Sequence, residues 1–203
     1  MKVGETVQIG LNKVTCNSAE KVDWSAFIGD NKIYAFYSDP PWGDGLMKYF
    51  ASLANRQTKT KDFSNISYKE LIDVFVSIIK NHVQGWVFIE TGYKWQDETV
   101  AAIAPYVKNI KLFDLIYNKD QRNVCIVGST IGDEYPISLH GLTGQNCSRT
   151  ALAAIKKDGA IVFDPCCGMG YVPNAAKSNG MVFYGGELNP ERVKQAIAKL
   201  QKK

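Results

Sequence analysis

The sequence predicts an α/β fold, a three-layer α/β/α sandwich around a mostly parallel sheet. Short apolar runs rich in β-branched and aromatic residues alternate along the chain with segments of helical periodicity. The apolar runs lack the polar alternation of a half-exposed strand, which is typical of parallel strands covered by helices on both faces. With 203 residues, of which 45% are hydrophobic, the chain is long enough for one domain with a sizeable core.

Six apolar runs are predicted to be strands, at residues 33–37, 86–89, 112–117, 124–127, 160–163 and 181–184. Only a polar turn at residues 118–122 joins the third run to the fourth, so we expect these two to form an antiparallel hairpin at one edge of the sheet. Residues 3–18 are expected to add one further strand, which gives a seven-stranded sheet.

Helical spacing of apolar residues predicts helices at residues 68–79, 97–107, 149–157 and 190–200. Ser67 is the expected N-cap of the first helix, and Pro190 suits the first turn of the last. Residues 131–144 are interpreted as a loop inside a single domain of residues 1–203. It connects a first half, about 1–130, to a second half at 145–203.

Composition excludes several classes of protein. No apolar run approaches the ~20 residues that span a bilayer, and no signal peptide is recognisable, so we expect a cytoplasmic protein without a membrane partner. The formal net charge of +4 is compatible with a polyanionic partner but does not require one. The five cysteines contain no CxxC pair and only two histidines accompany them, so no metal site is expected and the cysteines are interpreted as small buried residues.

The first motif with chemical content is Asp39-Pro40-Pro41-Trp42, directly after the first predicted strand. The carboxyl end of a buried strand is where open α/β sheets bind ligands. Two prolines prevent both helix and ladder from continuing, and Trp42 offers a flat aromatic face beside a carboxylate and free carbonyls. This combination suits a planar base with an exocyclic amine. The alternative is a structural Pro-Pro turn with a core tryptophan. Residues 43–45, Gly-Asp-Gly, are expected to leave the loop free to move.

The second motif covers residues 164–170, Asp-Pro-Cys-Cys-Gly-Met-Gly, between a predicted strand and a helix. Its two glycines let the backbone approach a ligand closely, but the third glycine of a GxGxxG pattern is missing, so the motif alone is a weak signal. Glu187 strengthens it. This acid ends the next predicted strand, 19 residues after Gly168, where it can accept hydrogen bonds from ribose hydroxyls.

Together these residues resemble the S-adenosylmethionine-dependent amino-methyltransferases that modify N6 of adenine or N4 of cytosine. Residues 39–42 match the family's catalytic (D/N/S)-P-P-(Y/F/W) motif. Residues 164–170 resemble its cofactor loop, commonly D-P-F-x-G-x-G, with Cys166 at the Phe position. Residues 186–193 resemble the ribose-binding strand end and the following helix. The catalytic motif precedes the cofactor motif, as in the permuted β class, and the resemblance covers most of the chain.

The resemblance implies a Rossmann-like class I methyltransferase fold that binds S-adenosyl-L-methionine. The implied cofactor-binding residues are Asp164, Pro165, Cys166, Cys167, Gly168, Met169, Gly170, Glu187, Leu188 and Asn189. The implied catalytic residues are Asp39, Pro40, Pro41 and Trp42. Asp39 and the Pro40 carbonyl would accept the two hydrogens of the target amine, and Trp42 would stack on the base. The implied partner is nucleic acid, with DNA expected, and Asp in first place with Trp in fourth favours adenine over cytosine.

Two features depart from the family pattern. The loop at 131–144 stands where DNA methyltransferases of this class carry a target-recognition insert, and residues 145–149 replace a frequent Lys-Pro pair. We therefore expect little sequence specificity, or a protein partner or homodimer that supplies it. Three alternatives stay open: an RNA adenosine methyltransferase, a protein glutamine methyltransferase and a non-catalytic subunit that needs a partner. Arg56, Lys59 and Lys61 are expected either to contact phosphates or to decorate a solvated loop.

Overall fold

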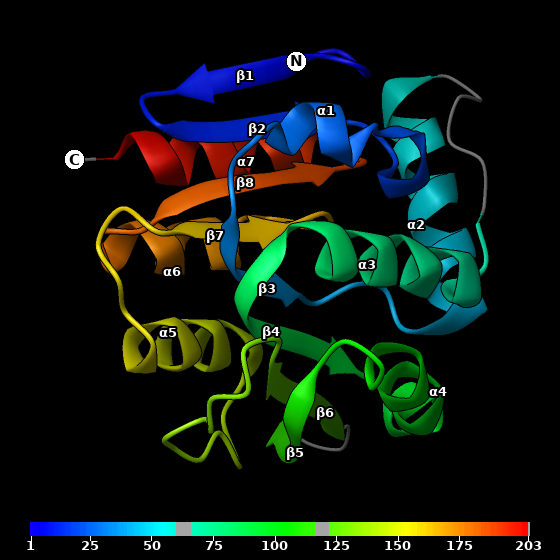
Figure 1. Cartoon of the computed structure of the whole chain (residues 1–203). Helices are drawn as coiled ribbons and strands as arrows, with labels where there is room; N and C mark the ends of the chain where they lie inside the picture. The colour runs from blue at the N-terminus through cyan, green and yellow to red at the C-terminus, as the bar shows by residue number, and fades with distance from the viewer. Residues whose placement is uncertain (60–65, 117–121, 203) are drawn as a thin grey trace.

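The computed structural model describes residues 1–59, 66–116 and 122–202, and it contains one eight-stranded sheet (Figure 1). The strand order is β1-β2-β8-β7-β3-β4-β6-β5. The strands are β1 Thr6–Ile9, β2 Asn12–Cys16, β3 Ile33–Ser38, β4 Val83–Thr91, β5 Lys108–Ile116, β6 Arg122–Ser129, β7 Ile161–Asp164 and β8 Val182–Glu187. All six runs predicted from the sequence are confirmed as strands.

The sheet is mostly parallel, with an antiparallel pairing at each edge. β2, β8, β7, β3 and β4 pair in parallel, whereas β6 pairs antiparallel with both β4 and β5. The expected hairpin of β5 and β6 therefore lies at one edge, although most of its predicted turn lies outside the described residues. The expectation of seven strands was wrong by one. The N-terminal stretch folds into two antiparallel strands, β1 and β2, because the residues Gly10 (φ 55°) and Leu11 turn the chain sharply.

Helices cover both faces of the sheet, which confirms the three-layer sandwich (Figure 1). Helices α1 Trp24–Ile28, α3 Tyr68–His82 and α4 Tyr93–Ile103 bury apolar residues on one face. Helices α5 Gly144–Ala154, α6 Tyr171–Ser178 and α7 Pro190–Gln201 do so on the other. A further helix, α2 Gly43–Thr58, and a short 3₁₀ turn at Ala19–Lys21 complete the described elements. None of the described helices has the length and apolar character needed to cross a membrane.

Helix boundaries follow the predicted signals in part. Ser67 caps α3 as expected, and a reciprocal capping box links it to Glu70. Helix α4 begins four residues before the predicted start and ends at Ile103, because Pro105 prevents the helix from continuing. Helix α5 begins at Gly144 rather than near 149. Four of the five cysteines are buried, as expected, and Cys166 is partly buried.

The central strands are apolar throughout because both of their faces are covered. On β3, Ala35 and Tyr37 belong to the core beneath α5, α6 and α7, while Ile33 and Phe36 belong to the core beneath α1, α3 and α4. In the strand order, β3 is followed in sequence by β4, which lies on the side of β3 away from β7, and β7 is followed by β8, which lies on the side of β7 away from β3. The boundary between β3 and β7 is therefore the switch point of the sheet, where the two loops that follow these strands diverge and leave room for a ligand.

Candidate active site at the carboxyl edge of the sheet

The two sequence motifs meet at this switch point although they lie more than a hundred residues apart in the chain. β3 and β7 pair in parallel with Phe36 opposite Phe163, so both strands end at the same edge. The hydroxyl of Ser38, the residue before Asp39, donates a 2.9 Å hydrogen bond to Asp164 Oδ1. Both side chains are buried. This bond connects the end of the proposed catalytic strand directly to the first residue of the proposed cofactor loop.

The loop at 164–170 is held from inside by carboxylates and backbone amides. Asp164 Oδ1 also accepts the backbone N–H of Cys166 at 2.9 Å, and the N–H of Cys167 donates to the Gly186 carbonyl at 2.8 Å. Burial raises the pKa of Asp164 to about 8, opposed by the hydrogen bonds from Cys166 and Ser38. Pro165 is buried in the turn, whereas Met169 is 42% exposed at its tip.

Glu187 connects the loop to the end of β8. Its Oε2 accepts the N–H of Gly168 at 2.9 Å, and its Oε1 accepts the N–H of Asn189 at 2.8 Å. The residue is only 8% exposed, and burial raises the pKa of its carboxyl despite these backbone hydrogen bonds. Glu187 thus fixes the backbone at Gly168, after β7, and at Asn189, after β8, both of which the sequence predicted to bind the cofactor.

The two loop glycines have different roles. Both have positive φ, +52° at Gly168 and +86° at Gly170. A Cβ on Gly170 would lie 2.7 Å from Ala196 Cα, so this glycine lets helix α7 pack against the loop. At Gly168 the nearest atom to a Cβ would be the Cys166 carbonyl oxygen, 4.0 Å away, which leaves open space beside the backbone. Gly168 is therefore the position at which a ligand can approach the loop.

Asp39 is exposed at the end of β3, while Pro40 beside it is buried. The indole Nε1 of Trp42 donates to Asp39 Oδ1 at 3.2 Å, and the Trp42 ring lies against Gly92. Protein atoms around the carboxyl displace water and raise the pKa of Asp39 to about 6, although the bond from Trp42 acts in the opposite direction. Asp39 is thus open to a partner from solvent and yet titrates well above an ordinary aspartate.

Helix α2 corrects the expectation of a mobile loop after Trp42. Gly43 is the first residue of this helix, at φ +79°, and a Cβ there would collide with the Trp95 ring at 2.4 Å. Asp44 Oδ1 accepts the N–H of Tyr68 at 2.8 Å, which attaches the first turn of α2 to α3. The Gly-Asp-Gly sequence is therefore a tight helix start. Its composition indicated a flexible loop because local signals do not report contacts with Trp95 and Tyr68.

The rest of α2 reaches the end of β8. Ala51 and Ala54 are buried against Leu188, the residue after Glu187. Asn189 donates through Nδ2 to Gln57 Oε1, and the Arg192 guanidinium lies 4.6 Å from the centre of the Phe50 ring. One helix therefore extends from the catalytic motif to the cofactor-side strand end and contacts both.

The predicted phosphate contacts are not gathered around Asp39. Arg56 and Lys59 are exposed near the C-terminal end of α2, roughly 20 Å along the helix axis from Trp42 at its start. Arg56 therefore lies on a helix and not on the solvated loop that the sequence suggested. Lys61 lies outside the described residues.

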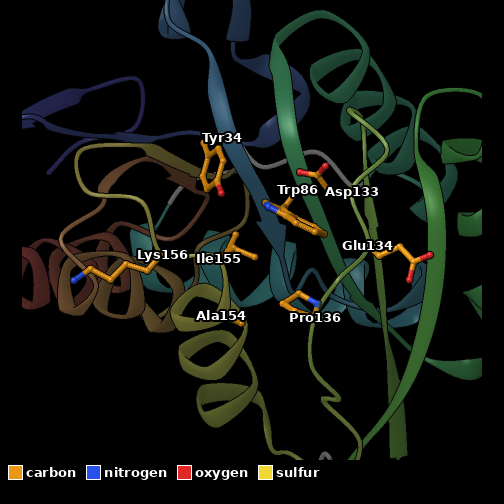
Figure 2. Close-up of a pocket in the computed structure, with 8 residues that line it drawn as sticks. All are labelled: Tyr34, Trp86, Asp133, Glu134, Pro136, Ala154, Ile155 and Lys156. Atoms are coloured by element: carbon orange, nitrogen blue, oxygen red, sulfur yellow. The ribbon is translucent and has the colours of Figure 1, made fainter.

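A pocket in the structure lies elsewhere. Its volume is about 440 Å³, and its walls include Tyr34 near the start of β3 and Trp86 near the start of β4 (Figure 2). These residues are at the opposite edge of the sheet from Asp39. The candidate site is instead the shared edge formed by the loops after β3, β7 and β8, because that is where the carboxyls, the loop amides and the strained glycine converge.

No protein-family model matches the chain, and no curated protein matches its sequence. Solved structures resemble its fold. The M1.HpyAVI–SAM complex has a TM-score of 0.68 at 13% identity, covering 93% of this chain and 98% of that one. TTHA0409 of Thermus thermophilus, complexed with S-adenosyl-L-methionine, has a TM-score of 0.62 at 14% identity, covering 92% of both chains.

A third structure is the PvuII DNA methyltransferase, which is cytosine-N4-specific. It has a TM-score of 0.66 at 11% identity and covers 99% of this chain and 91% of its own. The similarity extends over nearly the whole length of each chain. It confirms the Rossmann-like α/β fold that the sequence predicted.

Proposed function

We propose that this protein is an S-adenosylmethionine-dependent methyltransferase that acts on an exocyclic amine of a nucleobase in DNA, with N6 of adenine as the favoured target. The observation that carries the proposal is the Ser38–Asp164 hydrogen bond at the sheet's switch point. It joins the residue before Asp39, whose carboxylate suits an amine, to the first residue of the loop at 164–170, which suits a nucleoside-containing cofactor. The complexes of structural neighbours with S-adenosylmethionine support the choice of cofactor.

The residues at this edge fit S-adenosyl-L-methionine. Glu187 accepts the backbone N–H groups of Gly168 and Asn189, and a carboxylate has further acceptor capacity for a ribose hydroxyl. Gly168 has open space beside its backbone, where a side chain would otherwise stand. Exposed Met169 and half-buried Leu188 offer apolar surface near this space. We assign cofactor binding to residues 164–170 and 187–189.

In the proposed reaction the bound cofactor supplies an electrophilic methyl group. Asp39 and the Pro40 carbonyl accept hydrogen bonds from the two amine hydrogens, so the nitrogen lone pair turns from the ring toward the methyl group. The nitrogen would form its new bond to carbon as the methyl–sulfur bond breaks and the cofactor leaves as a thioether, and the nitrogen would then give one proton to Asp39 or to water. The Asp39 carboxylate stabilises the positive charge that develops on nitrogen. Trp42 supplies the aromatic surface on which an extruded base can stack.

Adenine and cytosine present the same kind of amine. The Asp-Pro-Pro-Trp sequence favours adenine, whereas the likeness to the cytosine-N4-specific PvuII enzyme supports cytosine as the second candidate. Labelled S-adenosylmethionine with unmethylated double-stranded DNA, single-stranded DNA and RNA in parallel, followed by nucleoside mass spectrometry, distinguishes them. We expect N6-methyladenine in DNA. Detection of N4-methylcytosine would make cytosine the target in place of adenine, and a product confined to RNA would make RNA the substrate in place of DNA. The absence of transfer to any nucleic acid would refute the proposal.

Two further alternatives stay open, a non-catalytic subunit because the connecting loop is small, and a glutamine methyltransferase because a glutamine amide is also a conjugated amine. A non-catalytic subunit would lack cofactor binding, which isothermal titration calorimetry with S-adenosylmethionine tests on the purified chain. A protein glutamine methyltransferase would transfer label to protein and not to nucleic acid. Residues 130–143 contain neither helix nor strand, so we expect little sequence preference in the DNA target. Comparing DNA duplexes of varied sequence measures that preference.

A further inference from the structure

A buried carboxyl lies beside the proposed catalytic acid, and the reaction outlined above does not use it. Glu90 is the next-to-last residue of β4, the strand that pairs with β3, and it is only 2% exposed. Strand alternation directs it to the same face as Trp86 and Phe88, which belong to the core beneath α5. Tyr37 pairs with Phe88 and Ser38 pairs with Ile89. The next residues along the two chain segments are Asp39, directly after β3, and Glu90, still on β4.

Side chains from both neighbouring strands hold Glu90 in place. The Tyr37 hydroxyl, from β3, donates to Glu90 Oε1 at 2.7 Å. The Asn123 amide, from β6, donates through Nδ2 to Glu90 Oε2 at 3.1 Å. Both partners are buried, and the Tyr37 ring also stacks on Phe88 with 5.4 Å between centroids. Tyr37 and Asn123 thus fix both carboxyl oxygens, and because a hydroxyl can also accept, the contact with Tyr37 can carry the hydrogen of a protonated Glu90.

Within the part of the chain that the structure describes, no cation pairs with this carboxyl. The five ion pairs found there all lie at the surface and none includes Glu90. An unpaired carboxylate buried beside another carboxylate is strongly unfavourable, because desolvation and like-charge repulsion act together. Two neutral hydrogen bonds offset only part of that cost. The geometry therefore favours a protonated Glu90.

We propose that Glu90 is a positioning residue that keeps its proton beneath the site, so that Asp39 alone carries the negative charge there. The proposal rests on the methyl-transfer function proposed above. In this role no proton leaves Glu90 during turnover. Its neutral side chain supports the end of β3 through Tyr37 without competing with Asp39 for positive charge on the target amine.

The titration of the surrounding groups agrees with this assignment. Burial first, and the charge of Asp39 second, raise the pKa of Glu90 well above its ordinary value. The pKa of Asp39 is raised only to about 6, so its carboxyl is ionised at neutral pH. The other titratable groups around Glu90 are Tyr37, Cys125 on β6 and Cys147 on α5. Burial raises the pKa of Tyr37 and of Cys125 well above their ordinary values, whereas a hydrogen bond with Cys125 lowers the pKa of Cys147.

The test compares Glu90→Gln with Glu98→Gln, the same change at an exposed site on α4. Glutamine imitates the protonated carboxyl. We expect Glu90→Gln to keep single-turnover methyl transfer at pH 7 within about threefold of the wild type. We also expect it to keep the acid limb that Asp39 produces. Glu98→Gln should show the wild-type profile. A Glu90→Gln rate at pH 7 that is tenfold or more below the wild type would overturn the proposal, because glutamine would then fail to replace a protonated carboxyl.

Infrared difference spectroscopy provides a readout that does not depend on activity. At pH 7 the wild-type spectrum minus that of Glu90→Gln should contain a protonated-carboxyl carbonyl band, and the wild-type spectrum minus that of Glu98→Gln should not. If this band is present but no substrate is methylated, the proposed function fails and the assignment of the proton to Glu90 stands. If methylation occurs but the band does not depend on Glu90, the inference fails and the proposed function stands.

Discussion

Two loops leave neighbouring strands at the same edge of the sheet, and they are held in different ways. The loop after β7 is held by Asp164 at the end of β7 and Glu187 at the end of β8, which are 1% and 8% exposed and accept backbone N–H groups of this loop. In the loop after β3, Asp39 is exposed and accepts the indole N–H of Trp42. The acids of the first loop maintain its shape, whereas the acid of the second faces outward.

This difference shows how one edge can serve two tasks. A loop whose amides are already bound to buried carboxyls needs little reorganisation when a ligand arrives, so little ordering entropy is lost on binding. An exposed carboxylate can exchange water for a substrate amine and can act where charge develops. Variants of the first loop should therefore affect cofactor affinity, and variants of the second should affect the rate of transfer.

The largest effect is expected for Asp39→Ala. Because Asp39 in the proposed reaction accepts a hydrogen bond from the amine whose charge changes in the transition state, the single-turnover rate should fall by roughly a hundredfold or more, about 2.7 kcal/mol. Cofactor affinity should stay close to the wild-type value, since the cofactor loop keeps its own hydrogen bonds. Rapid-quench transfer assays and calorimetry measure the two quantities. A near wild-type rate would mean that Asp39 is only a strand-end residue.

Glu187→Ala should give the complementary result. It removes an acceptor for the ribose and also releases the Gly168 and Asn189 amides, so S-adenosylmethionine binding should weaken by roughly 1.5–3 kcal/mol, or about tenfold to 150-fold in Kd. Glu191→Ala, on the exposed first turn of α7, is the matched control and should bind normally. An unchanged Kd for Glu187→Ala would mean that this residue does not bind the cofactor, and that the two loops do not divide cofactor binding and catalysis between them.

The pH dependence of transfer should follow the exposed acid. Because the pKa of Asp39 is raised to about 6, its carboxylate becomes protonated as the pH falls through that value. At pH 5, with saturating cofactor, the rate should therefore be about tenfold below its plateau. The Asp39→Asn variant should lack this limb. A wild-type rate that is constant from pH 5 to 7 would show that the protonation state of Asp39 does not control transfer.

The smallest effect is expected where α2 joins the two regions. Gln57 is exposed, so loss of its contact with Asn189 in Gln57→Ala should lower the free energy of unfolding by less than about 1 kcal/mol. Ser52→Ala, at another exposed position of the same helix, should change less. Urea unfolding of the three proteins measures the difference. A loss of several kcal/mol for Gln57→Ala would mean that α2 is a main support of the cofactor side.

Much of the fold and part of the site were readable from local pattern. The uninterrupted apolar runs of β3 and β7 predicted doubly covered strands, because such runs are stable only where helices bury both faces. The capping sequence at Ser67 predicted the start of α3 correctly. Residue types and spacing also indicated which side chains can contact a ligand, since Asp39, Gly168 and Glu187 follow strand ends. The sequence by itself thus determined six of the strands, four of the helices and the chemistry available at the strand ends, whereas no bounds were predicted for helices α1, α2 and α6.

The tertiary structure decided how those groups are used. Gly43 starts α2 because of Trp95, so it does not have the role that its neighbours in the sequence suggested, and Gly170 has the further task of accommodating Ala196. Glu90, at the end of an apolar run, has its role only in relation to Tyr37 and Asn123 on the adjacent strands. The physical reason is the distance along the chain over which each kind of interaction acts. Periodicity and propensity act within a few residues, whereas burial, charge coupling and hydrogen-bond partners arise between segments that only the folded sheet brings together.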